Sequence, residues 1–516
     1  MPRLEALRKE LSQFRPTPPP GGGGATPASW SHTPREDPNK VVHLATYGCQ
    51  QNVADTEVVR SLLQASGYGF SDDPDAADIV LLNTCAIRDN AEARVWRRLR
   101  ALRDKSMSRT ASRALRARRV GLLGCMAERL KEDLLSGDDP LVDLVVGPDA
   151  YRDLPRLLEV ADDRGDAINV ALSVDETYAD VAPVREDPQG KAAFVSIMRG
   201  CNNMCAFCIV PRTRGRERSR PMGSILAEVA ALADQGVREI TLLGQNVNSY
   251  QDLTSEPHPE FEARQTSAGF SPFIKRNEGG VRFAELLEKV AHTAPNTRIR
   301  YTSPHPQHFP LQLLQVMGDN ANVCNSIHLP AQSGSDSVLA SMRRGYTFDS
   351  YMQLVETIRE TLPGVHLSSD FISGFCGESD DDHARTLDLI RAAKYSKAYM
   401  FAYSMRERTH AHRKLVDDVP EDVKQARLSQ VIQTFQETAK DLHATELGTD
   451  HVVLVDAPSK RSSTGLIGRT DSNLTVAFDA QGTGAGIGDF VRVKITGTGS
   501  HTQQASFIQL QDTPHL

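Results

Sequence analysis

The sequence predicts an α/β protein with three folded parts: an N-terminal parallel α/β domain, a partial TIM-type (β/α)6 barrel and a small C-terminal all-β barrel. Short apolar runs alternate with amphipathic helical patterns over residues 39–160 and again over 187–445, as in parallel sheets covered by helices. Over residues 446–513, apolar runs separated by Gly-containing turns replace this alternation. A chain of 516 residues also exceeds what one hydrophobic core normally serves.

The first 38 residues are predicted to form a disordered leader. Pro18-Pro19-Pro20 and the glycines Gly21–Gly24 lie in this stretch, and such a composition cannot build a core. Its basic residues are those of a transit peptide, whereas Glu5 and Glu10 argue against one. No apolar run approaches the roughly 20 residues that a membrane span needs, so we expect no membrane association.

Three cysteines of the 39–160 region each follow a predicted strand: Cys49 after Val41–Ala45, Cys85 after Ile79–Leu82, and Cys125 after Val120–Leu123. Ligands of parallel sheets bind at the carboxyl ends of the strands, so we expect the three thiols to converge. A lone cysteine is often a small buried hydrophobic residue, but three at equivalent positions favour a metal cluster.

A second group of cysteines, Cys201, Cys205 and Cys208, has the spacing C-x3-C-x2-C directly after an apolar run. Three thiolates hold three corners of an iron–sulfur cube, whereas ordinary electron-transfer clusters take four. One iron is then open to bind S-adenosylmethionine, and the spacing is that of the radical-SAM superfamily. A zinc knuckle is disfavoured because structural zinc takes four ligands. Eight cysteines in so long a chain fit thiols kept for metal in a reducing compartment.

Six strands predict the partial barrel, whose site lies at its carboxyl face: Phe194–Met198, Glu239–Leu243, Arg298–Tyr301, Ser326–Leu329, His366–Ile372 and Ala398–Tyr403. Residues 251–280 are predicted to be a loop insertion. Five further runs predict the C-terminal β-barrel, a type that often holds nucleic acid: Val452–Val455, Thr464–Gly468, Leu474–Phe478, Phe490–Val493 and Phe507–Leu510.

Two basic runs stand out in a chain whose net charge is −7. One extends from Arg94 to Arg119 with Asp104 as its only acidic residue, and the other follows the second cysteine group. A solvated, salt-bridged face is the alternative for either run, but two runs beside the predicted chemistry favour an RNA-binding surface. The arginines expected to contact RNA are Arg214, Arg216, Arg218 and Arg220.

The chain resembles the MiaB-type methylthiotransferases, radical-SAM enzymes that place a methylthio group on tRNA. The resemblance extends from about residue 40 to the C-terminus. It rests on Thr46–Gln50, Asn83–Cys85, Leu123–Cys125, Met198–Cys201, Cys208–Pro211, Arg214–Pro221, Leu243–Val247, Ser303–Pro306, Leu329–Ser335 and Asp370–Ile372. Gly147–Arg152 and the insertion are most similar to the eukaryotic mitochondrial branch, named after association with a regulatory subunit of a cyclin-dependent kinase. The family commonly has Met where this chain has Gln51.

The resemblance implies two 4Fe–4S clusters and S-adenosylmethionine. Cys201, Cys205 and Cys208 would hold the cluster that cleaves S-adenosylmethionine, and Cys49, Cys85 and Cys125 an auxiliary cluster that carries the sulfur to be transferred. One S-adenosylmethionine methylates that sulfur, and a second yields the radical that activates C2 of an adenine. The expected S-adenosylmethionine contacts are Phe207, Gly244, Gln245, Asn246, Gln332 and Ser333, although Phe207 serves equally well as a core residue. The C-terminal barrel would be a TRAM domain.

The preferred function is conversion of N6-isopentenyladenosine, next to the anticodon of tRNA, to its 2-methylthio derivative. The alternatives are threonylcarbamoyladenosine of tRNA or a ribosomal-protein aspartate as substrate, or a non-catalytic iron–sulfur regulator of a kinase. Expected partners are the tRNA anticodon stem-loop, an electron donor, a sulfur donor and a kinase regulatory subunit. The expected location is the mitochondrial matrix, with the cytoplasm or nucleus as the alternative.

Overall fold

A computed structural model describes residues 40–86, 89–107, 118–136, 140–261, 270 and 279–515. The predicted leader and most of the predicted insertion lie outside these residues. The chain folds into two compact units, of which the first extends to Pro188 and also contains Ile209–Ala227. The second contains Gln189–Cys208 and Glu228–Leu516. The grouped cysteines therefore belong to the second unit, whereas the basic segment that follows them belongs to the first.

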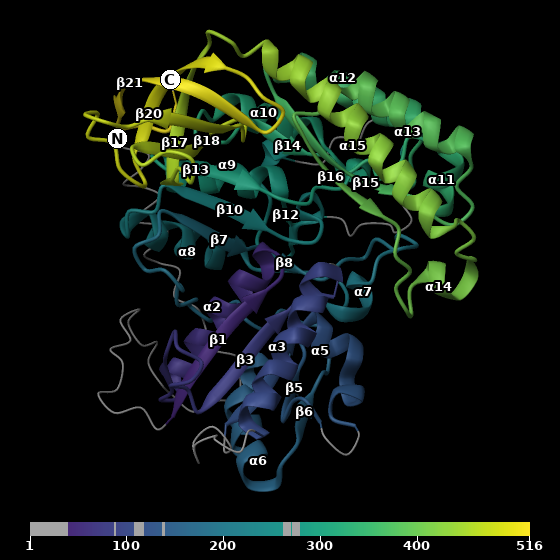
Figure 1. Cartoon of the computed structure of the whole chain (residues 1–516). Helices are drawn as coiled ribbons and strands as arrows, with labels where there is room; N and C mark the ends of the chain where they lie inside the picture. The colour runs from purple at the N-terminus through teal and green to yellow at the C-terminus, as the bar shows by residue number, and fades with distance from the viewer. Residues whose placement is uncertain are drawn as a thin grey trace. The chain divides into compact units, whose positions relative to one another are not determined.

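A six-stranded parallel sheet forms the centre of the first unit, with the strand order β2-β1-β3-β4-β5-β6 (Figure 1). Three of the strands confirm the sequence prediction, and β2, β5 and β6 add to it. The register pairs Tyr47 with Thr84 and Thr84 with Gly124, so β1, β3 and β4 end level with one another. The strands are β1 (Val41–Tyr47), β2 (Gly69–Phe70), β3 (Ile79–Thr84), β4 (Arg119–Gly124), β5 (Leu144–Val146) and β6 (Ala167–Asn169).

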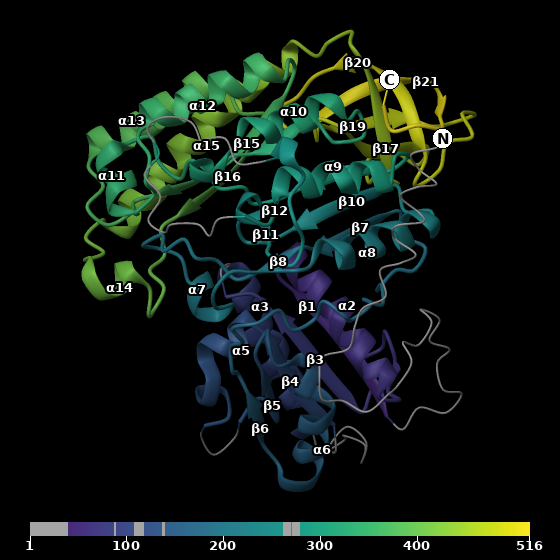
Figure 2. The same ribbon diagram turned by 180° about the vertical axis from the view of Figure 1, so that it is seen from behind.

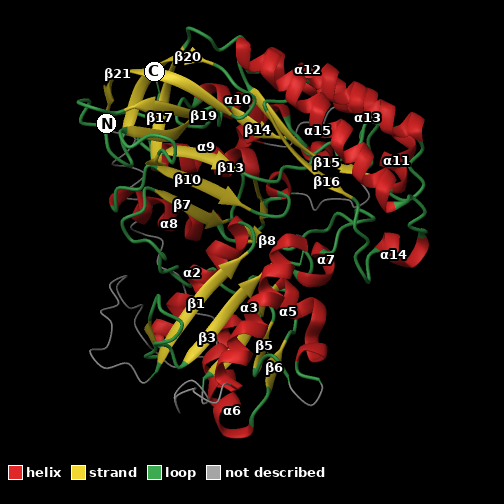
Figure 3. Cartoon of the chain, in the orientation of Figure 1, coloured by secondary structure: helices red, strands yellow, loops and turns green. Residues whose placement is uncertain are grey.

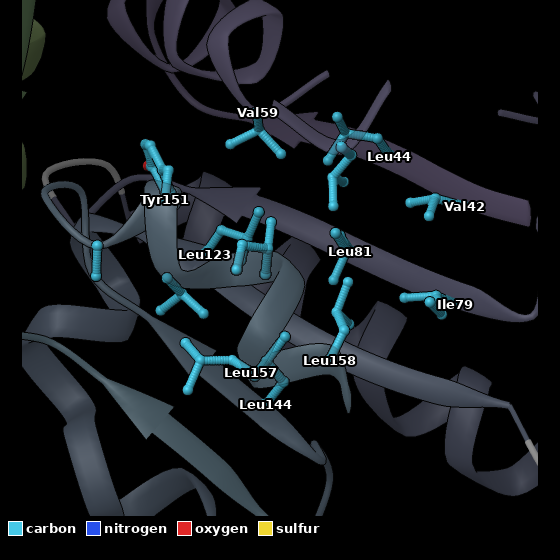
Figure 4. Close-up of a cluster of buried hydrophobic side chains, with 14 of the residues drawn as sticks. Val42, Leu44, Val59, Ile79, Leu81, Leu123, Leu144, Tyr151, Leu157 and Leu158 are labelled. Atoms are coloured by element: carbon cyan, nitrogen blue, oxygen red, sulfur yellow. The ribbon is translucent and has the colours of Figure 1, made fainter. Parts of the chain in front are cut away.

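Helices cover both faces of this sheet, which explains why the central strands β3 and β4 are buried along almost their whole length. Ile79 and Leu81 of β3 pack in a core with α2 (Gln50–Ala65) and α6 (Leu154–Arg164), shown in Figure 4. Val80 and Leu82 pack in a second core with α3 (Asp89–Met107) and α5 (Cys125–Leu130). Successive residues of a strand point to opposite faces, so one short apolar run serves both cores.

Two three-stranded parallel sheets form the centre of the second unit, in the orders β13-β10-β7 and β14-β15-β16. An isolated bridge between Ile299 and Val323 connects β13 to the segment that leads into β14. The strands are β7 (Ala192–Ser196), β10 (Glu239–Leu243), β13 (Arg298–Tyr301), β14 (Ser326–His328), β15 (His366–Ser373) and β16 (Lys397–Ala402). All six predicted β/α strands are confirmed, with ends that differ by at most two residues.

Helices follow these strands in alternation, and Figures 2 and 3 show them packed along the two sheets. Two of the helices begin at capping boxes, with Thr347 accepting from the Ser350 amide at 3.3 Å and Ser379 from the Asp382 amide at 3.2 Å. The helices are α8 (Met222–Asp234), α9 (Phe283–Thr293), α10 (Leu311–Asp319), α11 (Asp336–Ser341), α12 (Phe348–Thr361), α13 (Asp380–Ala393), α14 (His410–Lys414) and α15 (Glu421–Ala444). Among the described residues, no helix is long and apolar enough to cross a bilayer.

The C-terminal strands close into a five-stranded barrel in the order β17-β18-β19-β21-β20, as predicted. Its interior holds Val453, Val455, Val476, Phe478 and Val491. The strands are β17 (Asp450–Pro458), β18 (Gly465–Thr470), β19 (Thr475–Asp479), β20 (Phe490–Gly497) and β21 (Thr502–Gln511).

Two buried arginines of β13 attach this barrel to the rest of the second unit. Arg298 donates to the carbonyl oxygens of Val452 at 2.6 Å and Arg469 at 2.7 Å, and Arg300 donates to that of Thr470 at 2.6 Å. Glu239, at the start of β10, accepts from Arg300 at 2.7 Å. The small barrel is thus anchored at the amino ends of β10 and β13, away from the carboxyl ends where parallel sheets bind ligands.

Candidate functional site

The three dispersed cysteines lie side by side at the carboxyl ends of adjacent strands of the first unit. Cys85 and Cys125 come directly after β3 and β4, and Cys49 comes two residues after β1. The level ends of these strands bring the three cysteines to one edge of the sheet, where the Cys85 side chain lies within interaction distance of Cys49. The register of β1, β3 and β4 therefore places the three cysteines at the same carboxyl edge.

Two glycines and an asparagine hold the loops that carry these thiols. A Cβ on Gly48 would lie 2.9 Å from the Cβ of Cys85, and Gly124 has a φ of +88° with the Thr84 carbonyl oxygen 2.6 Å from its ideal Cβ. Asn52 accepts from the Cys49 amide at 3.2 Å and donates to the Thr84 carbonyl at 3.1 Å. Glycine is needed at both positions because any side chain would displace a cysteine loop.

An arginine and an aspartate lie buried beside these thiols. Arg214 Nη2 donates to Asp55 Oδ2 at 2.8 Å, and the two side chains are 5% and 0% exposed. The Cys85 hydrogen bond lowers the pKa of Cys49 to about 5 against the effect of burial, and the Arg214 charge contributes to the decrease. Burial raises the pKa of Cys125, and Arg214 opposes that rise. A cation beside three thiols favours their deprotonated, metal-binding form.

The four arginines expected to contact RNA differ in how deeply they are buried. Arg214, Arg218 and Arg220 are buried, whereas Arg216 is exposed. Arg218 forms an ion pair with Asp149 at 2.7 Å, and Arg220 donates to the Ser224 hydroxyl at 2.8 Å. The three buried side chains are enclosed by protein and each has an acceptor there, so Arg216 is the exposed member of the four. The alternation of basic and neutral residues did not reveal which of them face inward.

The first basic run is only partly described. Arg94, Arg97, Arg100 and Lys105 are exposed on α3, whereas Arg118 is buried and forms an ion pair with Asp75 at 3.4 Å. Arg109, Arg113 and Arg116 lie outside the described residues. The exposed part of α3 remains a basic surface of the first unit.

The second cysteine group lies in an irregular loop after β8 (Met198–Arg199). Cys201 and Cys205 are buried and Cys208 is half-buried. The Ala206 amide donates to the Met342 carbonyl at 2.8 Å, and the Ala206 carbonyl accepts from the Ala411 amide at 2.8 Å. These backbone bonds hold the middle of the loop against segments far away in the sequence.

An arginine that the sequence did not point to contacts this loop. Arg344 Nη1 donates to the Cys205 sulfur at 3.3 Å, and Arg344 Nη2 donates to the Pro330 carbonyl at 2.9 Å. Its Nε donates to the Tyr346 hydroxyl at 2.9 Å. Pro330 directly precedes the segment that contains Gln332 and Ser333, so Arg344 connects the cysteine loop to two of the expected S-adenosylmethionine contacts. No pattern in the sequence pairs Arg344 with Cys205, because they are far apart along the chain.

The expected S-adenosylmethionine residues have mixed surroundings. Phe207 packs with Ala206, Met342 and Phe375 in a hydrophobic cluster, which supports the core alternative. Gly244 lies against the Met198 side chain. A Cβ added to this glycine would be 2.5 Å from the Met198 Cγ. Gln245 is half-buried. Asn246 Oδ1 accepts from the His305 amide at 3.3 Å.

The loop after β14 holds the remaining two expected contacts. Gln332 has a positive φ of 71°. Its backbone amide donates to the Asp370 carbonyl of β15 at 2.9 Å, and its carbonyl accepts from the Ile372 amide at 3.0 Å. The hydroxyl of Ser333 pairs with that of Thr386 at 3.2 Å. This serine hydroxyl is therefore engaged in attaching α13.

One face of the β14-β15-β16 sheet carries exposed aromatic side chains. Tyr399 and Phe401 alternate on β16 and are 50% and 47% exposed. The register places Tyr399 beside Asp370, whose carboxylate lies 3.4 Å from His328 Nε2. The His328 and Tyr399 rings meet edge-on with centroids 5.8 Å apart. The interior of a complete (β/α)8 barrel is filled by side chains, so half-exposed aromatic residues mark an open face. Their alternation in the sequence was the signal that could have found them.

The two cysteines that match no ligand position have other surroundings. Cys324 is buried, and burial raises its pKa to about 11. Cys376 packs with Phe375 and Tyr403. Among the described residues, no three His, Cys, Asp or Glu side chains lie close enough together to bind a single metal ion. A 4Fe–4S cube distributes its thiolates over different irons, so a cluster does not require three thiols close enough to share one metal ion.

Comparison with known proteins places the chain in a family. Residues 195–390 match the radical SAM superfamily, and residues 41–147 match a family described as "Uncharacterized protein family UPF0004". The chain is 52% identical over 471 residues to the mouse "Mitochondrial tRNA methylthiotransferase CDK5RAP1", covering 89% of this chain and 80% of that protein. The chain belongs to the radical-SAM tRNA methylthiotransferases.

Bacterial relatives and solved structures extend the comparison. The "tRNA-2-methylthio-N(6)-dimethylallyladenosine synthase" of Chloroherpeton thalassium is 47% identical over 461 residues, 89% of this chain and 94% of that protein. The radical S-adenosylmethionine methyltransferase TsrM of Kitasatospora setae is 14% identical with a TM-score of 0.49, covering 72% of this chain and 77% of that one. This methylthiotransferase is a transferase whose family implies a 4Fe–4S cluster and S-adenosylmethionine.

Proposed function

We propose that this enzyme converts N6-isopentenyladenosine, next to the anticodon of tRNA, to 2-methylthio-N6-isopentenyladenosine. The observation that carries the proposal is the presence of two separate three-thiol sites, one in each unit. Three protein thiolates leave one iron of a cube open. The names of the relatives support the tRNA substrate.

The six cysteines would hold two clusters. Cys201, Cys205 and Cys208 bind the cluster of the radical-SAM domain, and Cys49, Cys85 and Cys125 bind the auxiliary one. When bound, the first cluster would supply the electron that cleaves S-adenosylmethionine to a radical, and the second would supply the sulfur that is transferred. The protein orients them, since Arg344 donates to the Cys205 sulfur and Asn52 holds the Cys49 loop. Gly48 and Gly124 allow the neighbouring loops that carry the auxiliary cysteines to approach closely.

The exposed aromatic face provides a surface for the substrate base. Single-stranded RNA bases are bound by stacking on aromatic side chains, which contributes about 1–3 kcal/mol per base. Tyr399 and Phe401 are half-exposed and neighbour the His328–Asp370 pair. The adenine with its alkenyl substituent stacks on these two rings, and the His–Asp pair contacts its polar edge.

The remaining RNA contacts are electrostatic. Arg216 and the exposed residues of α3 bind phosphates, and the closed β-barrel acts as a TRAM domain over residues 446–513. The cluster domain covers 39–160 and the radical-SAM domain 187–445. The enzyme works in the mitochondrial matrix with an electron donor and a sulfur donor, and a kinase regulatory subunit is a further partner.

Nucleoside mass spectrometry of tRNA tests this proposal. Cells that lack the protein should lose 2-methylthio-N6-isopentenyladenosine and accumulate N6-isopentenyladenosine, and the wild-type gene should restore the product. A variant with Cys201, Cys205 and Cys208 replaced by Ala should not restore it. An unchanged methylthio product in every compartment contradicts the substrate assignment. Loss of the methylthio form of threonylcarbamoyladenosine instead supports the other tRNA substrate, and restoration by the cysteine variant supports a non-catalytic role.

A further inference from the structure

Arg214 has one guanidinium nitrogen that makes no hydrogen bond to the described residues. Its side chain is 5% exposed and its Nη2 donates to Asp55 at 2.8 Å. Its Nη1 is buried and has no hydrogen-bond acceptor among the residues that the structure describes. An unpaired buried N–H of a charged group is costly, so this donor calls for an acceptor that belongs to the functional state.

The surroundings of Arg214 indicate where that acceptor lies. Ile209, at the start of the segment that carries Arg214, packs against Cys125 and Ala86. The anchor Asp55 is on α2, one turn after Asn52, which holds the Cys49 amide and sulfur at 3.2 Å and 3.4 Å. The guanidinium thus lies between segments that carry two of the three auxiliary thiols.

Gln51 belongs to the same arrangement. Its Nε2 donates to Asp55 Oδ1 at 3.3 Å, while Arg214 occupies Asp55 Oδ2. Gln51, Asp55 and Arg214 are all buried. This chain therefore has a glutamine that orients the carboxylate at the position where the family commonly has methionine.

We propose that Arg214, oriented by Asp55 and Gln51, is a positioning residue that donates its free N–H to a sulfur of the auxiliary cluster and raises the cluster's reduction potential. Hydrogen bonds to sulfur and local charge are the means by which proteins set such potentials. Reduction adds negative charge, which a nearby guanidinium stabilises. The inference rests on the proposed auxiliary cluster.

The test replaces each partner of the Arg214–Asp55 ion pair in turn and measures the reduction potential of the auxiliary cluster. The full-length chain with Cys201, Cys205 and Cys208 replaced by Ala is reconstituted anaerobically, so that only the auxiliary cluster is present. Its midpoint potential is then measured by a redox titration followed by electron paramagnetic resonance. Arg214→Met should lower the potential by the equivalent of a tenfold change in the reduction equilibrium, about 59 mV for one electron. Asp55→Asn should raise it, because the carboxylate is lost while the cation stays.

A matched control separates this role from general damage. Arg218→Met removes a buried arginine of the same segment that pairs with Asp149 instead of Asp55, and it should leave the potential unchanged. Equal potentials for Arg214→Met, Asp55→Asn and the parent protein would overturn the proposal, as would shifts of the same sign. If Arg214→Met fails to fold, the nearly isosteric Asp55→Asn decides alone. Absence of iron in the parent protein would instead contradict the auxiliary cluster itself.

Discussion

The two cysteine sites of this enzyme are assembled in different ways. Cys201, Cys205 and Cys208 come from one loop of eight residues, and their spacing alone predicts their chemistry. Cys49, Cys85 and Cys125 come from three loops that only the strand order of the sheet brings together. One site therefore depends on local sequence, whereas the other depends on the register of β1, β3 and β4.

Each site also has a buried arginine, but the two arginines are used differently. Arg344 donates to the Cys205 sulfur and to the Pro330 carbonyl, so its contacts within the protein are made. Arg214 is held by Asp55 and keeps Nη1 without an acceptor in the described part of the chain. We therefore expect the first arginine to stabilise the loop as well as the cluster, and the second to act mainly on the cluster.

The largest effect is expected when one cysteine ligand is replaced, because this should remove one cluster and leave the other in place. Cys205→Ala should abolish formation of 5′-deoxyadenosine, whereas Cys85→Ala should abolish methylthiolation and retain some cleavage of S-adenosylmethionine. Iron analysis should show a decrease from about eight to about four irons in each variant. Cys324→Ala is the control, because that thiol is buried outside both sites, and it should keep all the iron. Loss of both clusters in either variant would contradict their independence.

A smaller, local effect is expected at the glycines of the dispersed site. Gly124→Ala places a Cβ 2.6 Å from the Thr84 carbonyl at a φ of +88°. It should lower the free energy of unfolding by about 1–3 kcal/mol and reduce the iron of the auxiliary site. Gly165→Ala has a φ of +99° but nothing within 4 Å of its ideal Cβ, and it should retain full iron. Equal iron loss in both variants would show that backbone strain alone, not crowding, is responsible.

Arg344→Met should have an intermediate effect confined to the grouped site. The loss of a hydrogen bond to a charged group lowers the free energy of unfolding by about 1.5–3 kcal/mol. Chemical denaturation measures this decrease. The potential of the radical-SAM cluster should fall, while that of the auxiliary cluster stays constant. A change in the auxiliary potential would mean that the two sites are not electrostatically separate.

The smallest effect is expected for Gln51→Met, which introduces the residue common in the family. It removes one donor at 3.3 Å from Asp55 while the Arg214 bond remains. The free energy of unfolding should change by about 1 kcal/mol or less, and the auxiliary potential should shift less than in Asp55→Asn. A shift as large as that of Asp55→Asn would make Gln51, not Arg214, the main contact of the carboxylate.

Several features of the protein were predictable because they are local. The alternation of apolar runs and helices identified all six barrel strands and all five strands of the C-terminal barrel. The spacing of the grouped cysteines identified their chemistry. The position of each dispersed cysteine after an apolar run predicted its strand end, since parallel strands share one carboxyl edge.

Other features were decided only by the tertiary structure. Whether Arg214 and Arg218 face RNA or the protein interior depends on Asp55 and Asp149, which lie far away in the sequence. The pairing of Arg344 with Cys205 and the exposure of Tyr399 and Phe401 have the same origin. The sequence by itself determined which segments form strands and which cysteines follow them. The tertiary structure decided which partner each charged side chain contacts. Burial and ion pairing depend on residues that are distant in the sequence and become neighbours only on folding.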